Sequence, residues 1–391
     1  MLTASRGVVG AAAACLAALA VVGCGPTSGS SSSTSSVTVS GHTLSIYISE
    51  PHDLAGDVMA QDVIRAEQMA FSAHRSEVTD YSLRLQPVRL AKPSDNARAA
   101  IMDSSSIAYL GEIAPGASDQ TVGITNAQDL LQVSPTDNAL ELSDATPAVS
   151  GGPHSYFESW STYGRTFARM VPSGSLEARA QVAEMKSLGV TKLYVSSDGS
   201  DYGRALADAV TIDASGSGIA VTKTLASADA VFYGAQSPSA AAHFFNRAAT
   251  TAPAAKLFGS SALNTPAFPA ALASSAAKHV YVTIPGYLPK DLPATGKSFV
   301  SLFRRASGHA ANVEAIFGYE AMSALLRVLK QEGKSANNRT AVVNAFLRQR
   351  KVPSVLGTYS IDSAGNTSLN GFVVARVSGG KLVPSAPAPL S

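Results

Sequence analysis

The sequence predicts an α/β protein with two parallel β-sheets covered by helices. Two series of short apolar strands alternate with single amphipathic helices, one between residues 43 and 133 and the other between residues 176 and 283. Short connections between such strands and helices are typical of right-handed βαβ units. The chain of 391 residues is long enough for two such units, each with its own core.

The first series opens with the segment 43–49, in which Leu44, Ile46 and Ile48 share one face of a strand. Apolar residues at positions 59, 63, 66 and 70 then step by four, three and four, which predicts a helix that packs one face on a sheet. Further strands are expected within 81–90, at 107–110 and at 130–133.

The second series starts after Pro172, and its first helix is expected to end at Gly189. A third helix opens at Ser237-Pro238, where proline at the first helical position sacrifices no hydrogen bond. The expected helices are 176–188, 202–214 and the one after 238, and the expected strands are 192–195, 219–222, 230–233, 256–258 and 279–283. Beyond Pro285 we expect helices at 299–306, 313–330 and 339–350, strands at 358–361 and 372–377, and a turn at 362–365.

The N-terminal segment 1–23 is expected to be a lipoprotein signal peptide. One positive charge, at Arg6, precedes an apolar run of 7–22, which is shorter than the roughly 20 residues needed to span a membrane. Small residues before Cys24 resemble the bacterial lipobox, so we expect cleavage before Cys24 and lipid on its sulfur. An ordinary secretory signal and an uncleaved anchor are the alternatives. The Ser-rich segment 24–41 is expected to be a flexible tether.

Composition argues against several classes of function. Without Arg6 the chain has 29 basic and 28 acidic residues and no long block of either sign, so no nucleic-acid partner is expected. Cys15, the only cysteine besides Cys24, lies in the signal segment, so no disulfide is expected. Seven scattered histidines lack the spacing of a zinc site, and we expect neither a metal nor a cofactor.

Four stretches carry a resemblance to a known family: Val195–Ala207, Val231–Ala235, Phe317–Met322 and Gly357–Gly365. In their order and spacing they resemble the periplasmic binding proteins of the branched-chain amino acid uptake family, the type I substrate-binding fold, over about residues 44–383. The resemblance implies two Rossmann-like lobes joined by three crossing segments, with a ligand enclosed between them. It places 42–172 and 285–362 in lobe one, and 173–284 and 370–384 in lobe two.

In lobe one, ligand contacts are expected where two strands end. Parallel sheets bind ligands beyond the carboxyl ends of their strands, and the loops 111–118 and 133–138 hold Ser118, Thr136 and Asn138 there. Asn138 and Glu141 also have the spacing of a capping box, which is a structural alternative for Asn138. The resemblance implies that these loops hold the α-carboxylate of an amino acid, although Pro115 replaces a family serine and has no N–H to donate.

In lobe two, the resemblance points to Tyr202, Gln236 and Ser261. Tyr202 corresponds to a tyrosine that closes over the ligand, and Gln236 stands where the family commonly has an aromatic residue. Ser261 stands in a loop that supplies an acidic residue to the ligand ammonium in amino-acid-binding members. Because serine cannot neutralise a cation, either another carboxylate such as Glu112 or Asp137 serves, or the ligand has no ammonium group.

These features predict a non-enzymatic, lipid-anchored substrate-binding protein of an ABC importer outside the cytoplasm. A small polar ligand, an amino acid or a related carboxylate or amide, is expected to be captured by hinge closure and passed to a permease with cytoplasmic ATPases. The sequence has no Gly-x-Ser-x-Gly elbow and no complete P-loop, which argues against an enzyme. The alternative is a sensory or envelope-regulatory lipoprotein that binds a protein partner without transport.

Overall fold

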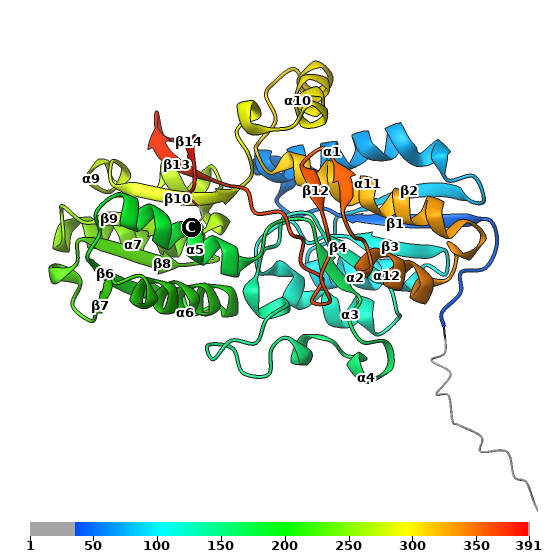
Figure 1. Ribbon diagram of the computed structural model, residues 1–391, viewed down its shortest axis with the longest axis horizontal. Helices are drawn as coiled ribbons and strands as arrows, with labels where there is room; N and C mark the ends of the chain where they lie inside the picture. The colour runs from blue at the N-terminus through cyan, green and yellow to red at the C-terminus, as the bar shows by residue number, and fades with distance from the viewer. Residues whose placement is uncertain (1–35, 390–391) are drawn as a thin grey trace, which may run out of the picture. The chain divides into compact units, whose positions relative to one another are not determined.

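The computed structural model describes residues 36–389, which form two α/β lobes built on separate sheets (Figure 1). We call the part built on the five-stranded sheet lobe one and the part built on the seven-stranded sheet lobe two. All five strands of lobe one are parallel, in the order β2-β1-β3-β4-β5. They are β1 (Thr43–Ser49), β2 (Ser82–Val88), β3 (Ser106–Leu110), β4 (Leu131–Ser134) and β5 (Phe167–Arg169).

The core of lobe one forms where α1 and α11 pack on each other and on β1. Leu44 and Ile46 of β1 are fully buried against this layer, together with Phe317 of α11. Asp57 is the N-cap of helix α1, and its side chain accepts a hydrogen bond from the Ala60 N–H at 3.0 Å. The helices of lobe one are α1 (Val58–His74), α2 (Pro93–Met102), α3 (Val122–Asn126), α4 (Trp160–Tyr163), α10 (Ala294–Ser307), α11 (Ala315–Glu332) and α12 (Arg339–Leu347).

The sheet of lobe two has a parallel body and an antiparallel edge, in the order β14-β13-β10-β9-β8-β6-β7. The two edge strands β13 and β14 form a hairpin through Gly379 and Gly380, which both have positive φ. The strands are β6 (Lys192–Ser197), β7 (Ala220–Thr222), β8 (Ala230–Gly234), β9 (Lys256–Gly259), β10 (Val280–Pro285), β13 (Phe372–Ser378) and β14 (Lys381–Pro387). The helices are α5 (Gly174–Ser187), α6 (Asp201–Gly216), α7 (Pro238–Thr251), α8 (Ala267–Ala270) and α9 (Ser274–Ala277).

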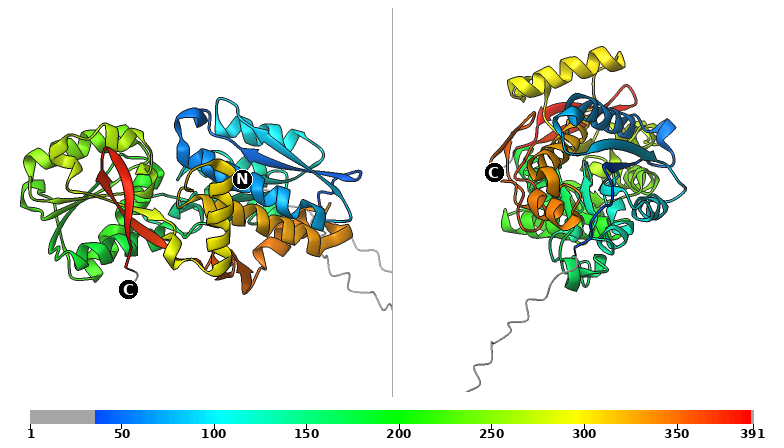
Figure 2. Two further views of the ribbon diagram at one scale, coloured as in Figure 1. Left: turned by 90° about the horizontal axis from the view of Figure 1, so that it is seen from above. Right: turned by 90° about the vertical axis from the view of Figure 1, so that its right-hand side faces the viewer.

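The chain passes between the lobes three times, which confirms the predicted architecture. It leaves lobe one after β5, returns after β10, and leaves again after the small hairpin of β11 (Val352–Ser354) and β12 (Gly357–Tyr359). The passages are bonded to one another: the Arg169 N–H donates to the Gly365 carbonyl at 2.9 Å, and the Gly286 N–H to the Gly371 carbonyl at 3.0 Å. Helix α10 lies on the outside, away from both sheets (Figure 2).

Several elements differ from the sequence-based expectation. β14 contains two prolines, and proline inside a strand is confined mainly to sheet edges, which is where β14 lies. The last helix ends at Leu347 rather than at residue 350. Val39, which falls in the predicted tether, is buried, and its N–H donates to the Asn337 carbonyl at 2.8 Å. The chain is therefore fixed on lobe one at residue 39. The predicted signal peptide and Cys24 lie outside the described residues.

We predict that Gly318→Ala destabilises lobe one. A Cβ at Gly318 would lie 2.5 Å from the Val63 carbonyl oxygen of α1, so the two helices would have to separate. Overpacking of this kind costs about 1–3 kcal/mol, which thermal unfolding would detect as a lower melting temperature. Gly216→Ala in α6 is the matched control, because its Cβ meets no atom within 4 Å. A Gly318→Ala protein as stable as the wild type would contradict the close helix packing.

Candidate functional site

The side chain of Asp137 organises the lobe-one half of the site. It is fully buried, and its carboxylate accepts hydrogen bonds from the main-chain N–H groups of Gly116 at 2.6 Å, Ser118 at 2.8 Å and Ala139 at 3.0 Å. These loops follow the neighbouring strands β3 and β4. The N–H groups of Gly116 and Ser118 in the loop after β3, where the sequence suggests that an anionic ligand is held, are therefore bonded to a carboxylate of the protein itself.

The hydroxyl groups of Ser118 and Thr136 also hold the loops in shape. The Thr136 hydroxyl donates to the Ile113 carbonyl at 2.6 Å, and the Ser118 hydroxyl accepts from the Glu112 N–H at 3.2 Å. Both residues are fully buried. Their side chains therefore bind neighbouring loop atoms of lobe one.

Asn138, Tyr202 and Ser261 meet between the lobes. The Asn138 amide of lobe one donates to the Ser261 hydroxyl of lobe two at 3.1 Å, and the Tyr202 and Ser261 hydroxyl groups lie 3.2 Å apart. The capping-box alternative for Asn138 is wrong, because the short helix over Leu140–Leu142 has Ala139 as its N-cap and no side-chain cap. The loop places Asn138 toward lobe two instead.

Gln236 makes a second polar contact between the lobes. Its amide donates to the Pro115 carbonyl at 3.1 Å. The approach is close because the intervening residue is glycine: a Cβ on Gly116 would lie 2.8 Å from the Cβ of Tyr202 and 2.9 Å from the Gln236 amide nitrogen. Gly116 also has a φ of 80°, which glycine adopts without strain.

Glu177 is the central residue that the sequence analysis missed. It lies in the first turn of α5, fully buried, and its carboxylate accepts from the Ser261 N–H at 2.7 Å and the Ser261 hydroxyl at 2.8 Å. The Asn138 amide donates to the same carboxylate. Burial raises the pKa of Glu177 to about 7, against the opposing effect of these hydrogen bonds. An acidic residue in a first helical turn is common for structural reasons, so the sequence held no local signal of this role.

Two further carboxylates of lobe one border the site. Glu314, just before α11, accepts from the Asn264 amide of lobe two, and burial raises its pKa to about 8 with added repulsion from Asp57 and Glu177. Glu112 lies within lobe one, where it accepts from the Ser49 hydroxyl at 2.7 Å. Of the acids that the sequence offered in place of Ser261, Glu112 and Asp137 are both bonded within lobe one. The carboxylate bonded to Ser261 belongs to Glu177.

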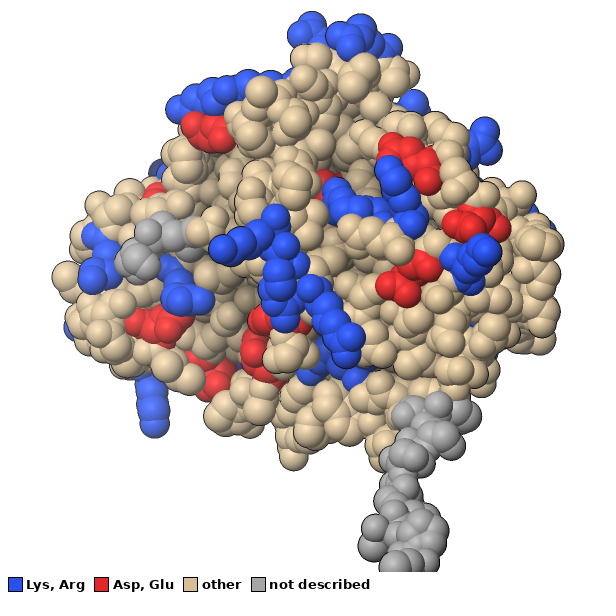
Figure 3. Space-filling view, turned by 45° about the vertical axis from the view of Figure 1, so that its right-hand side comes forward, with Lys and Arg blue, Asp and Glu red and all other residues tan. Residues whose placement is uncertain are grey.

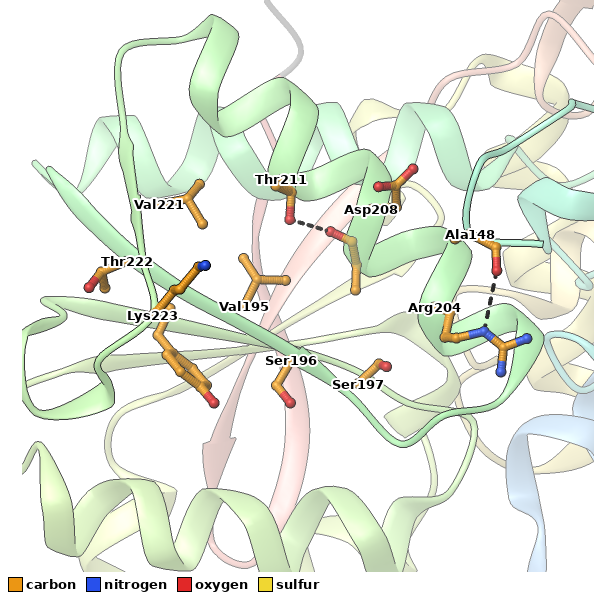
Figure 4. A pocket seen from close by; sticks show the side chains of 12 residues that line it. Ala148, Val195, Ser196, Ser197, Arg204, Asp208, Thr211, Val221, Thr222 and Lys223 are labelled. Atoms are coloured by element: carbon orange, nitrogen blue, oxygen red, sulfur yellow. Dashed lines mark hydrogen bonds between the residues drawn. The ribbon is translucent and has the colours of Figure 1, made fainter. Parts of the chain in front are cut away.

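A cavity of about 370 Å³ lies beside the contact between Asn264 and Glu314. Both lobes line it, through Val58, Met59 and Asn312 of lobe one and Asn264, Thr265, Pro266, Pro269, Gly380, Lys381 and Leu382 of lobe two. A second cavity, of about 470 Å³, lies on β6, α6 and β7 of lobe two and reaches Ala148 (Figure 4). None of the six predicted ligand residues lines either cavity.

Charged side chains of both signs lie on the surface. On the face shown in Figure 3, acidic side chains lie beside basic ones. Within residues 36–389, no group of three His, Cys, Asp or Glu side chains is placed to hold a metal ion. No helix in this same part of the chain combines the length and apolar character needed to cross a membrane.

Comparison with known proteins identifies the fold. No protein-family model and no curated protein matches the chain. A leucine binding protein, LivK, from Thermotoga maritima matches with a TM-score of 0.72 and 16% identity over 89% of this chain and 99% of that one. LivJ from Streptococcus pneumoniae, in complex with isoleucine, matches with a TM-score of 0.67 and 14% identity over 88% of this chain and 99% of that one. A solute binding protein from Rhodopseudomonas palustris, in complex with 3,4-dihydroxybenzoic acid, matches with a TM-score of 0.65 and 14% identity over 90% of this chain and 98% of that one.

The chain has the type I periplasmic binding fold. The predicted resemblance is therefore confirmed at the level of the fold, over nearly the whole length of the solved structures. Within this binding fold, the six predicted residues come from both lobes. Asn138, Tyr202 and Ser261 form one connected group, and Gln236 touches the loop after β3 of lobe one. The hydroxyl groups of Ser118 and Thr136 bond to main-chain atoms of that loop. Their roles toward a ligand stay predictions.

We predict that the buried carboxylate of Glu177 makes the protein less stable as the pH rises. Its pKa is raised from 4.5 to about 7, so its contribution to stability is full below pH 4.5 and is lost as the pH rises through 7. The loss is on the order of 3 kcal/mol. Glu177→Gln removes this titration, so its stability relative to the wild type should increase between pH 4.5 and pH 8 in denaturant unfolding. A difference independent of pH would contradict the burial of an ionisable group.

Proposed function

We propose that the protein is the extracytoplasmic substrate-binding component of an ABC importer, which holds a small polar ligand between its two lobes. The observation that carries this proposal is the meeting of Asn138, Glu177, Tyr202 and Ser261 from both lobes in one buried polar group. Polar side chains converging from two lobes suit a ligand that is released when the lobes part.

Closure would act through a change of hydrogen-bond partners. In the closed arrangement Asn138 bonds directly to Ser261, and Gln236 bonds directly to Pro115. A ligand that takes over these bonds stabilises the closed form only by the difference between its contacts and the direct ones. The three bonded passages between the lobes keep the two halves of the site in register during such a movement.

The proposed ligand differs from the α-amino acids that the resemblance implies, because the loop assigned to an α-carboxylate already binds a carboxylate of the protein. The N–H groups of Gly116 and Ser118, in a loop that the resemblance assigns to an α-carboxylate, donate to Asp137. A ligand carboxylate there would have to displace the Asp137 carboxylate and would lie beside another negative charge. The leucine, isoleucine and dihydroxybenzoate named for the similar structures are ligands of those proteins.

The proposal includes two membrane partners, the lipid on Cys24 and a permease. Lipid on Cys24 would keep the protein at the outer face of the cytoplasmic membrane, where a permease with cytoplasmic ATPases takes up the cargo. The lipobox before Cys24 and the fixed position of residue 39 on lobe one support this arrangement.

A second candidate is a sensory or regulatory lipoprotein that binds a protein partner and no small molecule. One observation favours it: residues expected to contact a ligand are already bonded to one another across the lobes, as in the Asn138 to Ser261 bond. Such contacts would hold the lobes closed as a fixed surface for a partner.

We predict that a small molecule raises the melting temperature of the protein. A ligand at 100 times its dissociation constant adds about 2.7 kcal/mol to the free energy of unfolding. A thermal-shift panel of amino acids, carboxylates, amides, amines and small aromatic compounds would detect it. If no compound shifts the transition, the importer proposal fails and the regulatory candidate gains.

We predict that Cys24→Ser releases the protein from the membrane fraction. Without its thiol the chain cannot receive the lipid, so the folded part should be recovered in the soluble fraction with an unchanged melting temperature. Fractionation followed by immunoblotting measures this. A Cys24→Ser protein that stays in the membrane fraction would indicate an uncleaved anchor at residues 7–22 instead.

A further inference from the structure

We propose that the site between the lobes recognises a small organic cation, an amine or a guanidinium compound, through carboxylate and amide oxygens. The inference rests on the proposed function, because it names the class of ligand that the same site takes. Three independent features of the site support it: an occupied anion position, an uncompensated carboxylate, and buried acceptors without donors.

The position for an anion is occupied by Asp137. Three main-chain N–H groups, of Gly116, Ser118 and Ala139, converge on its two carboxylate oxygens within 3.0 Å. The two loops are thus joined by an internal carboxylate, and those three donors are not free for a second one. A ligand therefore needs no carboxylate of its own to complete this half of the site.

The Glu177 carboxylate has donors but no compensating cation. Ser261 gives it an N–H and a hydroxyl, and Asn138 gives it an amide N–H, all from neutral groups. In the part of the chain that the structure describes, no Lys, Arg or His pairs with Glu177. Arg169 is the buried cation of this region, and its guanidinium donates to the carbonyls of Asp137 and Ala139 and to Ser143.

Two acceptors next to Glu177 have no donor. Asn138 and Gln181 are fully buried, and their amide oxygens have no hydrogen-bond partner among residues 36–389. The amide nitrogen of Gln181 donates to the Gly259 carbonyl at 2.7 Å, and that of Asn138 contacts Ser261. A buried acceptor without a donor is unfavourable, because it has lost its hydrogen bonds to water. An ammonium or guanidinium group supplies donors only, so it matches this excess of acceptors.

A cavity between the lobes is lined by Asn264, whose amide donates to the Glu314 carboxylate of lobe one. Glu177 does not line it, so in the hinge movement that we propose the lobes must part before a cation reaches this carboxylate. The apolar side chains of Val58, Met59 and Leu382 line the same cavity. A volume of about 370 Å³ fits a molecule with a short hydrocarbon part and one or two charged ends.

The experiment measures binding to the full chain at pH 8 by calorimetry and thermal shift. The cationic probes are methylammonium, 1,4-diaminobutane and 4-guanidinobutylamine, and the comparison probes are propionate, benzoate and leucine. We expect at least one cationic probe to bind and raise the melting temperature by several degrees, with no effect of the comparison probes. Glu177→Gln should weaken cation binding at least tenfold. Glu184→Gln, a more exposed carboxylate on the same helix, should leave it unchanged.

A second measurement does not depend on the folding of a variant. Because a cation needs the ionised carboxylate of Glu177, its affinity for the wild type should fall at least tenfold between pH 8 and pH 5.5. Affinity that is independent of pH, or unchanged in a folded Glu177→Gln protein, would overturn the inference.

The outcomes separate this inference from the proposed function. Binding of leucine or a carboxylate without binding of any cation would overturn the cationic ligand and leave the importer proposal standing. If none of the six probes raises the melting temperature, the inference is also overturned. If no compound of the wider thermal-shift panel raises it, the importer proposal is overturned as well.

Discussion

The rest of the site depends on the Asp137 carboxylate and the three N–H groups that it binds. It joins the loop after β3 to the loop after β4, because Gly116 and Ser118 belong to the first and Ala139 to the second. Asn138 lies between Asp137 and Ala139, which are bonded to each other, and its side chain is directed at Ser261 of lobe two. Asp137 thereby fixes the two loops through which lobe one contacts lobe two, while lobe two supplies the polar atoms opposite.

The fold was predictable because its signals are local. The alternation of strands and amphipathic helices gave the two lobes, and Ser237-Pro238 marked the start of α7 at the residue where it begins. Elements without periodicity were missed: β5 has three residues, and β14 contains prolines that argue against a strand. The antiparallel edge of lobe two also escaped prediction, because strand direction depends on how the chain returns between lobes.

The site was predictable only in part. Strand ends pointed to Ser118, Thr136 and Asn138, and the structure buries all three after β3 and β4, with Asn138 in contact with lobe two. Their hydrogen-bond partners were not predictable, since Asn138 and Ser261 are 123 positions apart in the chain. Glu177 was not predictable either, because an acid in the first turn of a helix is common. Only the folded chain brings its carboxylate to the Ser261 N–H. Position 261 holds serine where the resemblance implies an acid, and the carboxylate bonded to this serine is that of Glu177 in α5.

The buried Val39 assigns different mechanical roles to the two lobes. The chain enters lobe one at this residue and is bonded to the turn before α12, so lobe one is the part that a membrane tether would hold. Between Cys24 and Ser36 the chain can span at most roughly 40 Å when fully extended. With the anchor that we propose, lobe one stays in place relative to the membrane and lobe two moves. A permease in the membrane would therefore detect the opening of the site as a displacement of lobe two alone.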